Sequence, residues 1–397
     1  MKKYIIAVLL VIFWLAVLLP VKKSTAIPAF GRKYRISCQT CHSPAIPALK
    51  PYGDEFAGAG SRLEDYESPR YFMDTGDDEL SLLRELPLSV RFDGHFSYNN
   101  AGSEYPDFGF PYGLKLMSGG EVSEKLSYYF YVYIDERGEV AGVEDAFLMY
   151  HDLLGTGINL YAGQFQVSDP LFKRELRLIL EDYHIYKVSP GNSSVSLTYD
   201  RGILIEYELP TGTGIVAEVV NGNGLGEAGE GILFDKDRYK NYLIRVSQPL
   251  GEYFNIGLFG YFGKEELQET TQTQINKSNF FGPDLSFSVN DKFALNVQYL
   301  LRQDGTVMTG PGVYANDVNT HGGFVEAIYS PEGDDGKWYF AGLANWVESD
   351  LTELNYKTGT IHAGHLLRRN LRIVGEYTYQ FEGIEHGRAS IGFVSAF

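Results

Sequence analysis

Two kinds of hydrophobic pattern divide the chain. A single apolar run lies near the N-terminus, whereas from about Leu88 onward short segments alternate apolar and polar residues, with Gly, Asn, Asp and Pro between them. Such alternation places successive side chains on opposite faces of a β-strand, so that one face is apolar. The pattern continues to the C-terminus and predicts an all-β region over residues 88–397.

Segment 89–98 illustrates the alternation. Its apolar side chains share one face and its polar side chains the other: Val90, Phe92, Phe96 and Tyr98 against Arg91, Asp93, His95 and Ser97. Segments 292–303 and 370–380 behave in the same way. Runs of about ten residues are long enough for a tilted strand to cross an outer membrane.

About sixteen such segments follow one another, an even number of the kind that bacterial single-chain barrels use. They cover residues 88–98, 111–121, 125–134, 142–150, 157–165, 201–209, 213–221, 239–249, 252–262, 278–288, 292–302, 321–330, 336–347, 357–367, 370–380 and 387–397. A soluble β-sandwich also alternates, but sixteen strands exceed one sandwich. Tyrosines cluster towards segment ends, and Ile391, Phe393 and Phe397 share one face of the last segment. We therefore predict a transmembrane antiparallel β-barrel.

One segment departs from the strand pattern. Residues 169–188 place apolar side chains at nearly helical spacing, with charged residues, among them Lys173, Arg174 and Arg177, elsewhere on the segment. In a barrel this segment is typical of the long loop that folds into the lumen of porins and narrows the pore. The alternative is an ordinary helix in an extracellular loop.

The N-terminal run is typical of an export signal. A basic start precedes the apolar residues 5–21, and the small residues 24–26 suit a cleavage site, so the expected signal peptide is 1–26. An uncleaved membrane anchor is the alternative, although seventeen residues are few for crossing about 30 Å of hydrocarbon. The rest of the chain is expected to leave the cytoplasm for the outer membrane of a Gram-negative bacterium.

The chain is acidic. Its formal net charge is −17, and loss of the signal would remove four lysines and take the charge to −21. This balance disfavours nucleic acid as a partner and suits attraction of cations. The acidic residues concentrate in 74–79, 226–231 and 331–336, which are predicted to be loops.

The two cysteines of the chain stand together in Cys38-Gln39-Thr40-Cys41-His42. Two thiols separated by two residues and followed directly by histidine indicate covalent attachment of a c-type haem. Each thiol adds to one vinyl group of the haem, and His42 is then placed as the proximal ligand of the iron. A zinc site lacks a second pair of ligands, and the flanks lack the βαβ context of a redox cysteine pair.

The sixth ligand of the iron is less clear from the sequence. Met73 is the one methionine between the motif and the first strand, and it is the tentative distal ligand. His95 is the alternative, and His151 comes next along the chain. The glycine-rich stretch 221–231 is predicted to be a loop, because no lysine or helix follows it as a phosphate site requires. No catalytic constellation emerges.

The domain organisation follows from these segments: a signal at 1–26, a monohaem cytochrome c segment at 27–87 and the barrel at 88–397. The middle segment is too short to enclose a haem by itself. We therefore expect it to sit in or against the barrel lumen, next to Arg91, Asp93 and His95.

The stretch "AIPAFGRKYRISCQTCH", followed by "PALKPYGDEF" and a barrel, resembles the fused monohaem cytochrome c-porins of the outer membrane. The resemblance is specific over about Ala26 to Phe56, and Lys33-Tyr34 departs from the Gln-Thr of the iron-oxidising members. It implies electron transfer between an extracellular donor or acceptor, Fe²⁺ in the first place, and a periplasmic cytochrome, with possible Fe²⁺ oxidase activity. The partners would also include the lipid bilayer.

Two other functions compete with electron transfer. The chain could be a solute-conducting porin whose haem is a plug, sensor or accessory, and the basic residues of 169–188 would suit anions. It could also be a soluble periplasmic cytochrome with a β-domain.

Overall fold

The computed structural model describes residues 29–63, 76, 83, 86–100, 105–140, 142–268 and 273–397. The expected signal at 1–26 and the tentative ligand Met73 lie outside these residues. Among the described helices, none is both long and apolar enough to cross a membrane.

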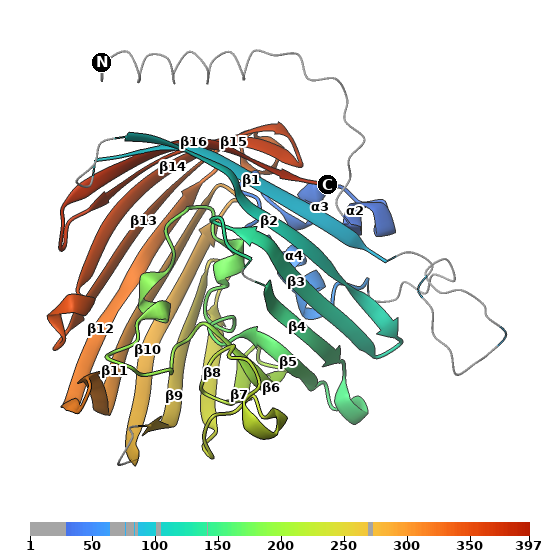
Figure 1. The fold of residues 1–397 in the computed structure, drawn as a ribbon. Helices are drawn as coiled ribbons and strands as arrows, with labels where there is room; N and C mark the ends of the chain where they lie inside the picture. The colour runs from blue at the N-terminus through green and yellow to red at the C-terminus, as the bar shows by residue number, and fades with distance from the viewer. Residues whose placement is uncertain are drawn as a thin grey trace.

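A closed antiparallel barrel forms most of the described chain (Figure 1). Each strand pairs with its neighbours in sequence, and β1 closes the barrel against β16. The sixteen strands in the described chain are β1 Leu88–Asn99, β2 Tyr105–Ser123, β3 Leu126–Glu136, β4 Gly142–Tyr150, β5 Asn159–Gln166, β6 Tyr199–Glu208, β7 Gly214–Val220, β8 Asn241–Leu250, β9 Phe254–Gln268, β10 Thr273–Val289, β11 Phe293–Gly310, β12 Val313–Tyr329, β13 Trp338–Ser349, β14 Tyr356–Arg368, β15 Leu371–Gln380 and β16 His386–Ala396.

The predicted barrel and its strand count are confirmed, whereas several strands are longer than predicted. Strand β11 has 18 residues and β12 has 17. At their far ends the exposed side chains become polar, as at Gln303 and Asn319, which hydrogen-bond each other at 3.3 Å. The apolar stripe therefore ends before the strands do, and the hydrophobic pattern marks only the part that faces lipid.

The alternating faces are also confirmed. On β11, Gln298 and Arg302 are buried inside the barrel, while Tyr299 between them is 40% exposed on the outside. On β14 the apolar Ile361 is 68% exposed. Exposed apolar side chains on the outer wall are what a lipid environment requires, because closure of the barrel already pairs the backbone groups.

Residues 167–198, here called the inner loop, connect β5 to β6 inside the barrel (Figure 1). The predicted inward position is confirmed, but this segment forms no α-helix. It contains the short 3₁₀ turns η2 Arg174–Leu176 and η3 His184–Lys187. Neighbouring apolar residues such as Leu178 and Ile179 are both buried. Because it is enclosed by barrel walls, the segment has no solvent face that a helical stripe would need.

The inner loop packs tightly against the strands β10–β14. The Tyr183 ring stacks on Phe324 with centroids 4.1 Å apart, and its hydroxyl donates to Glu326 Oε2 at 3.0 Å. Arg302 Nη1 donates to the carbonyls of Val188 and Val195 at 2.7 and 2.8 Å. These contacts fill this side of the lumen.

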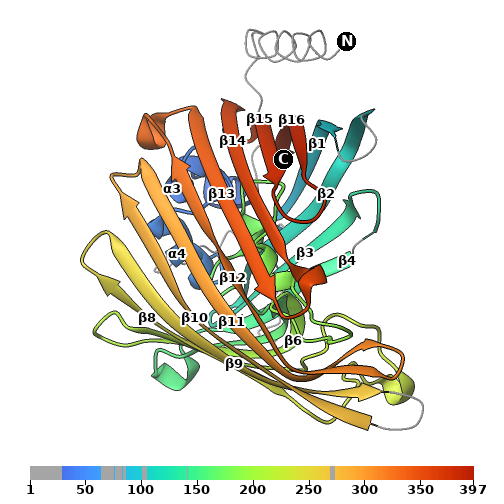
Figure 2. The ribbon, with the colours of Figure 1, turned by 90° about the vertical axis from the view of Figure 1, so that its left-hand side faces the viewer.

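Three short helices precede the barrel and lie inside one of its ends: α2 Ala29–Tyr34, α3 Cys38–Cys41 and α4 Pro51–Gly58 (Figure 2). Gln39 Nε2 donates to the Asp334 carbonyl at 3.0 Å, and Lys50 forms a salt bridge with the Asp334 carboxylate. Residue 334 belongs to the turn between β12 and β13. The segment therefore sits in the lumen, as expected.

This end of the barrel carries the start of β1 and the end of β16. Two of its turns, 124–125 and 369–370, have two residues each, whereas the connection 221–240 at the opposite end has twenty. Short turns face the periplasm in outer-membrane barrels and long loops face outward. The three helices thus occupy the periplasmic end.

Candidate functional site

The cysteine motif forms a single helical turn. Ser37 caps helix α3 by accepting from the Gln39 backbone N–H at 3.3 Å, and the His42 N–H donates to the Cys38 carbonyl at 2.9 Å. Cys38 and Cys41 are the first and last residues of this turn, His42 is its C-cap, and all three border one cavity. The structure therefore brings together the three residues that the motif predicts to act together.

Helix α4 approaches this turn closely. The Lys50 N–H donates to the Cys41 carbonyl at 2.9 Å. A Cβ atom at position 53 would lie 2.4 Å from that same carbonyl oxygen, nearer than any side chain can come. Gly53 is thus required for α4 to pack against the cysteine turn.

The imidazole of His42 is oriented by the backbone. Its Nδ1 lies 3.3 Å from the Ala48 carbonyl oxygen. A donating Nδ1 leaves the lone pair on Nε2, which is the arrangement that metal-binding histidines use. Burial lowers the pKa of His42 below its usual value, although this hydrogen bond opposes the shift. The neutral ring is the form that binds iron.

Both cysteines are free thiols rather than a disulfide. Burial raises the pKa of Cys38, and burial together with the neighbouring Cys38 raises the pKa of Cys41. The thiols therefore stay protonated near neutral pH. Thiols of this kind are the groups that add to haem vinyls.

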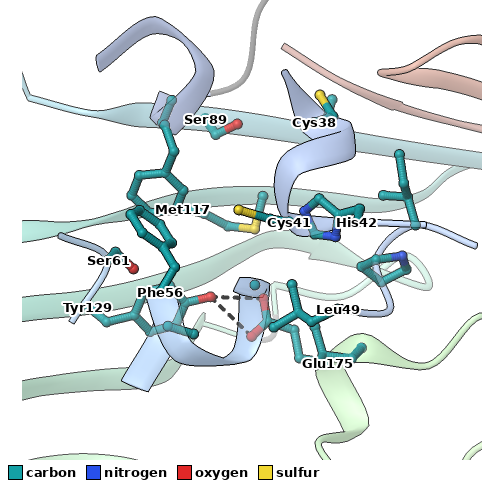
Figure 3. Close-up of a pocket in the computed structure, with 18 of the residues that line it drawn as sticks. Cys38, Cys41, His42, Leu49, Phe56, Ser61, Ser89, Met117, Tyr129 and Glu175 are labelled. Carbon is teal, nitrogen blue, oxygen red and sulfur yellow. Dashed lines mark hydrogen bonds between the residues drawn. The ribbon is translucent and has the colours of Figure 1, made fainter. Parts of the chain in front are cut away.

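A cavity of about 510 Å³ opens beside the motif (Figure 3). Its wall includes all three helices, the strands β1–β6 and β14–β16, and part of the inner loop. Apolar side chains such as Ile46, Leu49 and Phe56 line the motif side. The volume falls in the range of cofactor sites, about 300–1,000 Å³, and mostly apolar walls with a few polar groups are typical of them. The donor set and the cavity both fit a haem.

Met117 is a wall residue that sequence reasoning missed. It lies on β2 opposite Ser89 of β1 and Tyr131 of β3, and it lines the cavity with Cys41 and His42 (Figure 3). Met149 on β4 lines the same cavity. A thioether is a usual sixth ligand of haem iron. The signal was available in the sequence, because Met117 shares the inward face of its strand with Lys115.

The alternative ligand His95 faces a different space. It lines a second, smaller cavity of about 60 Å³, farther along β1 towards the outer end of the barrel. His151 is engaged elsewhere, with Nε2 2.6 Å from Ser127 Oγ. The structure does not place either histidine on the wall of the cavity beside His42 among its described residues.

Basic groups predominate around the second cavity. Its wall contains six basic and four acidic side chains, apart from histidines: Arg91, Lys115, Arg137, Arg174, Arg177 and Arg372 against Asp93, Glu136, Glu175 and Glu376. Four residues border both cavities: Arg91, Glu175, Arg372 and Val394. The two spaces are therefore neighbours, and the outer one is basic.

The inner loop supplies part of this charge. Arg174 Nη2 lies 2.5 Å from Asp182 Oδ2, and Arg177 and Lys187 approach the same carboxylate at 3.7 and 3.5 Å. These three cations hold the pKa of Asp182 well below its usual range, although burial opposes the shift. The carboxylate stays charged and fixes the two arginines at the cavity wall.

The acidic loops do not form a cation site in the described chain. No group of three or more His, Cys, Asp or Glu there is arranged to hold a metal ion. Turn 331–336 lies at the periplasmic end, where Asp334 pairs with Lys50, and most of 74–79 lies outside the described residues. Loop 226–231 is at the outer end. The acidic segments are thus split between the two ends.

No family model matches the chain, and no curated protein matches it. Solved structures match over 78% of it. They include OmpF of Salmonella typhi in complex with daunomycin, at 12% identity, TM-score 0.57 and 97% of that chain covered. An anion-selective porin from Comamonas acidovorans matches at 11% identity, TM-score 0.54 and 98% coverage. Pseudomonas putida OprB at high pH matches at 8% identity, TM-score 0.55 and 94% coverage.

The chain has the porin fold. Together with its apolar outer wall, this fold places it in the lipid bilayer of a Gram-negative outer membrane. The soluble periplasmic alternative is therefore wrong. At 8–12% identity the similarity to these porins shows the architecture alone, and the chemistry of the cysteine motif is argued from its own residues.

Proposed function

We propose that this protein is an outer-membrane electron carrier with one covalent haem c at the periplasmic end of its barrel. The observation that supports the proposal most directly is the cavity of about 510 Å³ beside Cys38, Cys41 and His42. The resemblance of the N-terminal stretch to cytochrome-porins points the same way. A haem bound there supplies one-electron exchange between its ferric and ferrous states.

The residues of the chain divide the work of holding the group. Cys38 and Cys41 would hold the group by two thioether bonds, and His42 would offer Nε2 to its iron while the Ala48 carbonyl holds the ring at Nδ1. We assign Met117 as the distal ligand in preference to Met73, because Met117 lines the cavity beside His42 and is half-buried. Met149 on the same wall is 3% exposed, and His95 lines the second cavity. The apolar wall excludes water and so tunes the potential of the iron.

The position of the motif determines which partner meets it directly. A hydrocarbon core of about 30 Å separates the outer surface from the periplasm, and the helices lie at the periplasmic end. A periplasmic cytochrome therefore docks at that end. An extracellular donor or acceptor exchanges electrons from the outer side of the lumen, and the basic second cavity favours anionic complexes of Fe²⁺ over the free dication.

Attachment of haem is the first test. The full chain is expressed with its signal in a host that matures c-type cytochromes, and outer membranes are analysed for covalent haem by the pyridine haemochrome spectrum. We expect about one haem per wild-type chain and none in Cys38→Ala/Cys41→Ala. A matched control, Ser43→Ala, keeps the haem. Wild-type barrels that fold without haem would falsify the proposal.

Spectra of the purified protein test the distal ligand. Met117→His should remove the far-red band that a methionine gives on ferric iron and should lower the potential. Met149→Leu is the matched control and should change neither. An unaltered spectrum in Met117→His returns the assignment to Met73.

A solute-conducting porin is the second candidate, and the porin architecture favours it. Conductance of single wild-type molecules in planar bilayers, together with stopped-flow reduction by Fe²⁺ and by Fe²⁺-citrate, separates the two. Rapid haem reduction with negligible conductance supports the electron carrier. Open conductance with a haem that neither donor reduces supports the porin.

A further inference from the structure

Arg372 on β15 is a buried cation without a hydrogen-bonding partner at two of its nitrogens. Its side chain is 3% exposed, and neither Nε nor Nη1 meets an acceptor among the described residues. The aromatic ring of Tyr339, 5.9 Å from the guanidinium carbon, is the nearby group that it faces. A buried, unpaired guanidinium is costly in free energy, so such a group points to a missing anionic partner.

Neighbouring arginines on the same wall already have carboxylates. Arg91 Nη2 lies 2.7 Å from Asp93 Oδ2, and Arg174 Nη2, on the wall of the second cavity, lies 2.5 Å from Asp182 Oδ2. Arg372 differs from these arginines, because no carboxylate among the described residues pairs with it. Glu376 lies 3.1 Å from His362 Nδ1, and Glu175, which borders both cavities, accepts from the Tyr129 hydroxyl at 3.0 Å. None of these carboxylates hydrogen-bonds Arg372, so we look for its partner outside the described residues.

The location of Arg372 indicates where that partner would sit. It borders both the cavity beside His42 and the basic second cavity. A guanidinium fork matches the two oxygens of a carboxylate. We propose that Arg372 binds a carboxylate within the cavity beside the cysteine motif.

Two sources could supply a carboxylate there. The first is a propionate of the haem, and in that case the inference rests on the proposed function. The second is a free carboxylate that enters the lumen, and in that case the inference holds without any haem. The chemistry at Arg372 is the same, so the experiment has one arm for each source.

The first arm measures the midpoint potential of haem-loaded protein. Removing a unit positive charge near the haem disfavours its ferrous state. For charges on the order of 10 Å apart at an effective dielectric constant of about 20, the ferrous-to-ferric ratio at fixed potential should fall about tenfold. Arg372→Met should show this change, and Arg372→Lys should keep most of the wild-type ratio. Arg201→Met on β6 removes an arginine that borders neither cavity and is the matched control.

The second arm uses the haem-free Cys38→Ala/Cys41→Ala chain and acetate as the probe. Acetate is compared with chloride at equal ionic strength, and the urea midpoint of unfolding in detergent is measured. A rise in midpoint that Arg372→Met abolishes and Arg201→Met retains identifies a free carboxylate as a ligand. Heat-modifiable migration on gels confirms that each variant is folded.

The outcomes separate the two proposals. Either arm responding specifically to Arg372 supports the carboxylate site and names its source. If Arg372→Met behaves like Arg201→Met in both arms, the site is overturned while haem attachment stands. If the wild type carries no haem, the proposed function fails, and the acetate arm still decides the role of Arg372.

Discussion

Two buried arginines face the lumen in opposite circumstances. Arg302 on β11 donates to the Val188 and Val195 carbonyls and pairs with Asp304 at 2.6 Å, within the region that the inner loop fills. Arg372 on β15 has two nitrogens that meet no acceptor within the described part of the chain, and it borders both cavities. The same residue type is therefore part of the packing on one side of the barrel and available to a ligand on the other.

The difference follows from what fills each side. The inner loop brings backbone carbonyls and apolar rings to β10–β14, so charges there are compensated inside the protein. On the side of β1–β6 and β14–β16, the short helices leave a hollow beside the motif. Compensated charge indicates a structural role, whereas uncompensated buried charge next to a cavity indicates binding.

The largest effect on the free energy of unfolding is expected at Arg302, which the inner loop covers. Arg302→Met leaves Asp304 buried without its cation and frees two carbonyls, which should lower the free energy of unfolding by about 3–5 kcal/mol. Urea titration of the protein in detergent micelles, followed by tryptophan fluorescence, measures it. A loss below about 1 kcal/mol would remove the distinction between the two arginines.

Replacing Arg372, beside the cavity, with Met should change the free energy of unfolding in the opposite direction. In the haem-free double cysteine variant, Arg372→Met removes an uncompensated buried charge and should raise the free energy of unfolding by about 1–2 kcal/mol. The measurement is the same urea titration, in chloride buffer. A destabilisation as large as that of Arg302→Met would show that Arg372 has a structural partner.

A smaller effect is expected at the inner loop, where it borders the cavity. Burial and the nearby Glu175 raise the pKa of Asp169 from 3.8 to about 6, although Lys173 opposes the shift. Between these values the folded protein holds a proton that the unfolded chain has released. The contribution to stability is therefore full below about pH 4 and lost as pH rises through about 6.

Asp169→Asn tests this pH dependence. The variant cannot ionise at this position, so its free energy of unfolding should fall less between pH 5 and pH 7.5 than that of the wild type, by about 1 kcal/mol. Unfolding at both pH values gives the comparison. Identical pH profiles would mean that Asp169 is ionised in the fold throughout.

The smallest effect is expected where the helices meet the periplasmic turn. The Lys50 and Asp334 side chains are 22% and 27% exposed, so their salt bridge is screened by water. Lys50→Met should cost about 0.5 kcal/mol or less. If the same titration shows a loss in the free energy of unfolding above about 2 kcal/mol, the Lys50–Asp334 salt bridge is a structural contact like that of Arg302.

Much of the fold could be predicted from the sequence. The sixteen strands follow from period-two alternation, and the inward polar face of β1 follows from Arg91, Asp93 and His95. The conformation of the inner loop was not predictable, because burial on every side removes the amphipathic signal. Strand ends beyond the lipid were missed for a related reason, since their outer faces are polar.

The candidate site was predictable only where it is local in sequence. Cys38, Cys41 and His42 lie within five residues, so their spacing can be recognised directly in the sequence. Met117 and Arg372 come from strands at opposite ends of the chain, and only closure of the barrel brings them to one cavity. The sequence indicates that each faces inward but not that they share a wall.

Closure of the barrel also completes the candidate site. The first and the last strands of the chain both border the cavity, and Arg91 on β1 pairs with Ala396 on β16. The same backbone pairing that leaves the barrel without a free edge therefore joins two parts of the cavity wall that lie about three hundred residues apart in the sequence.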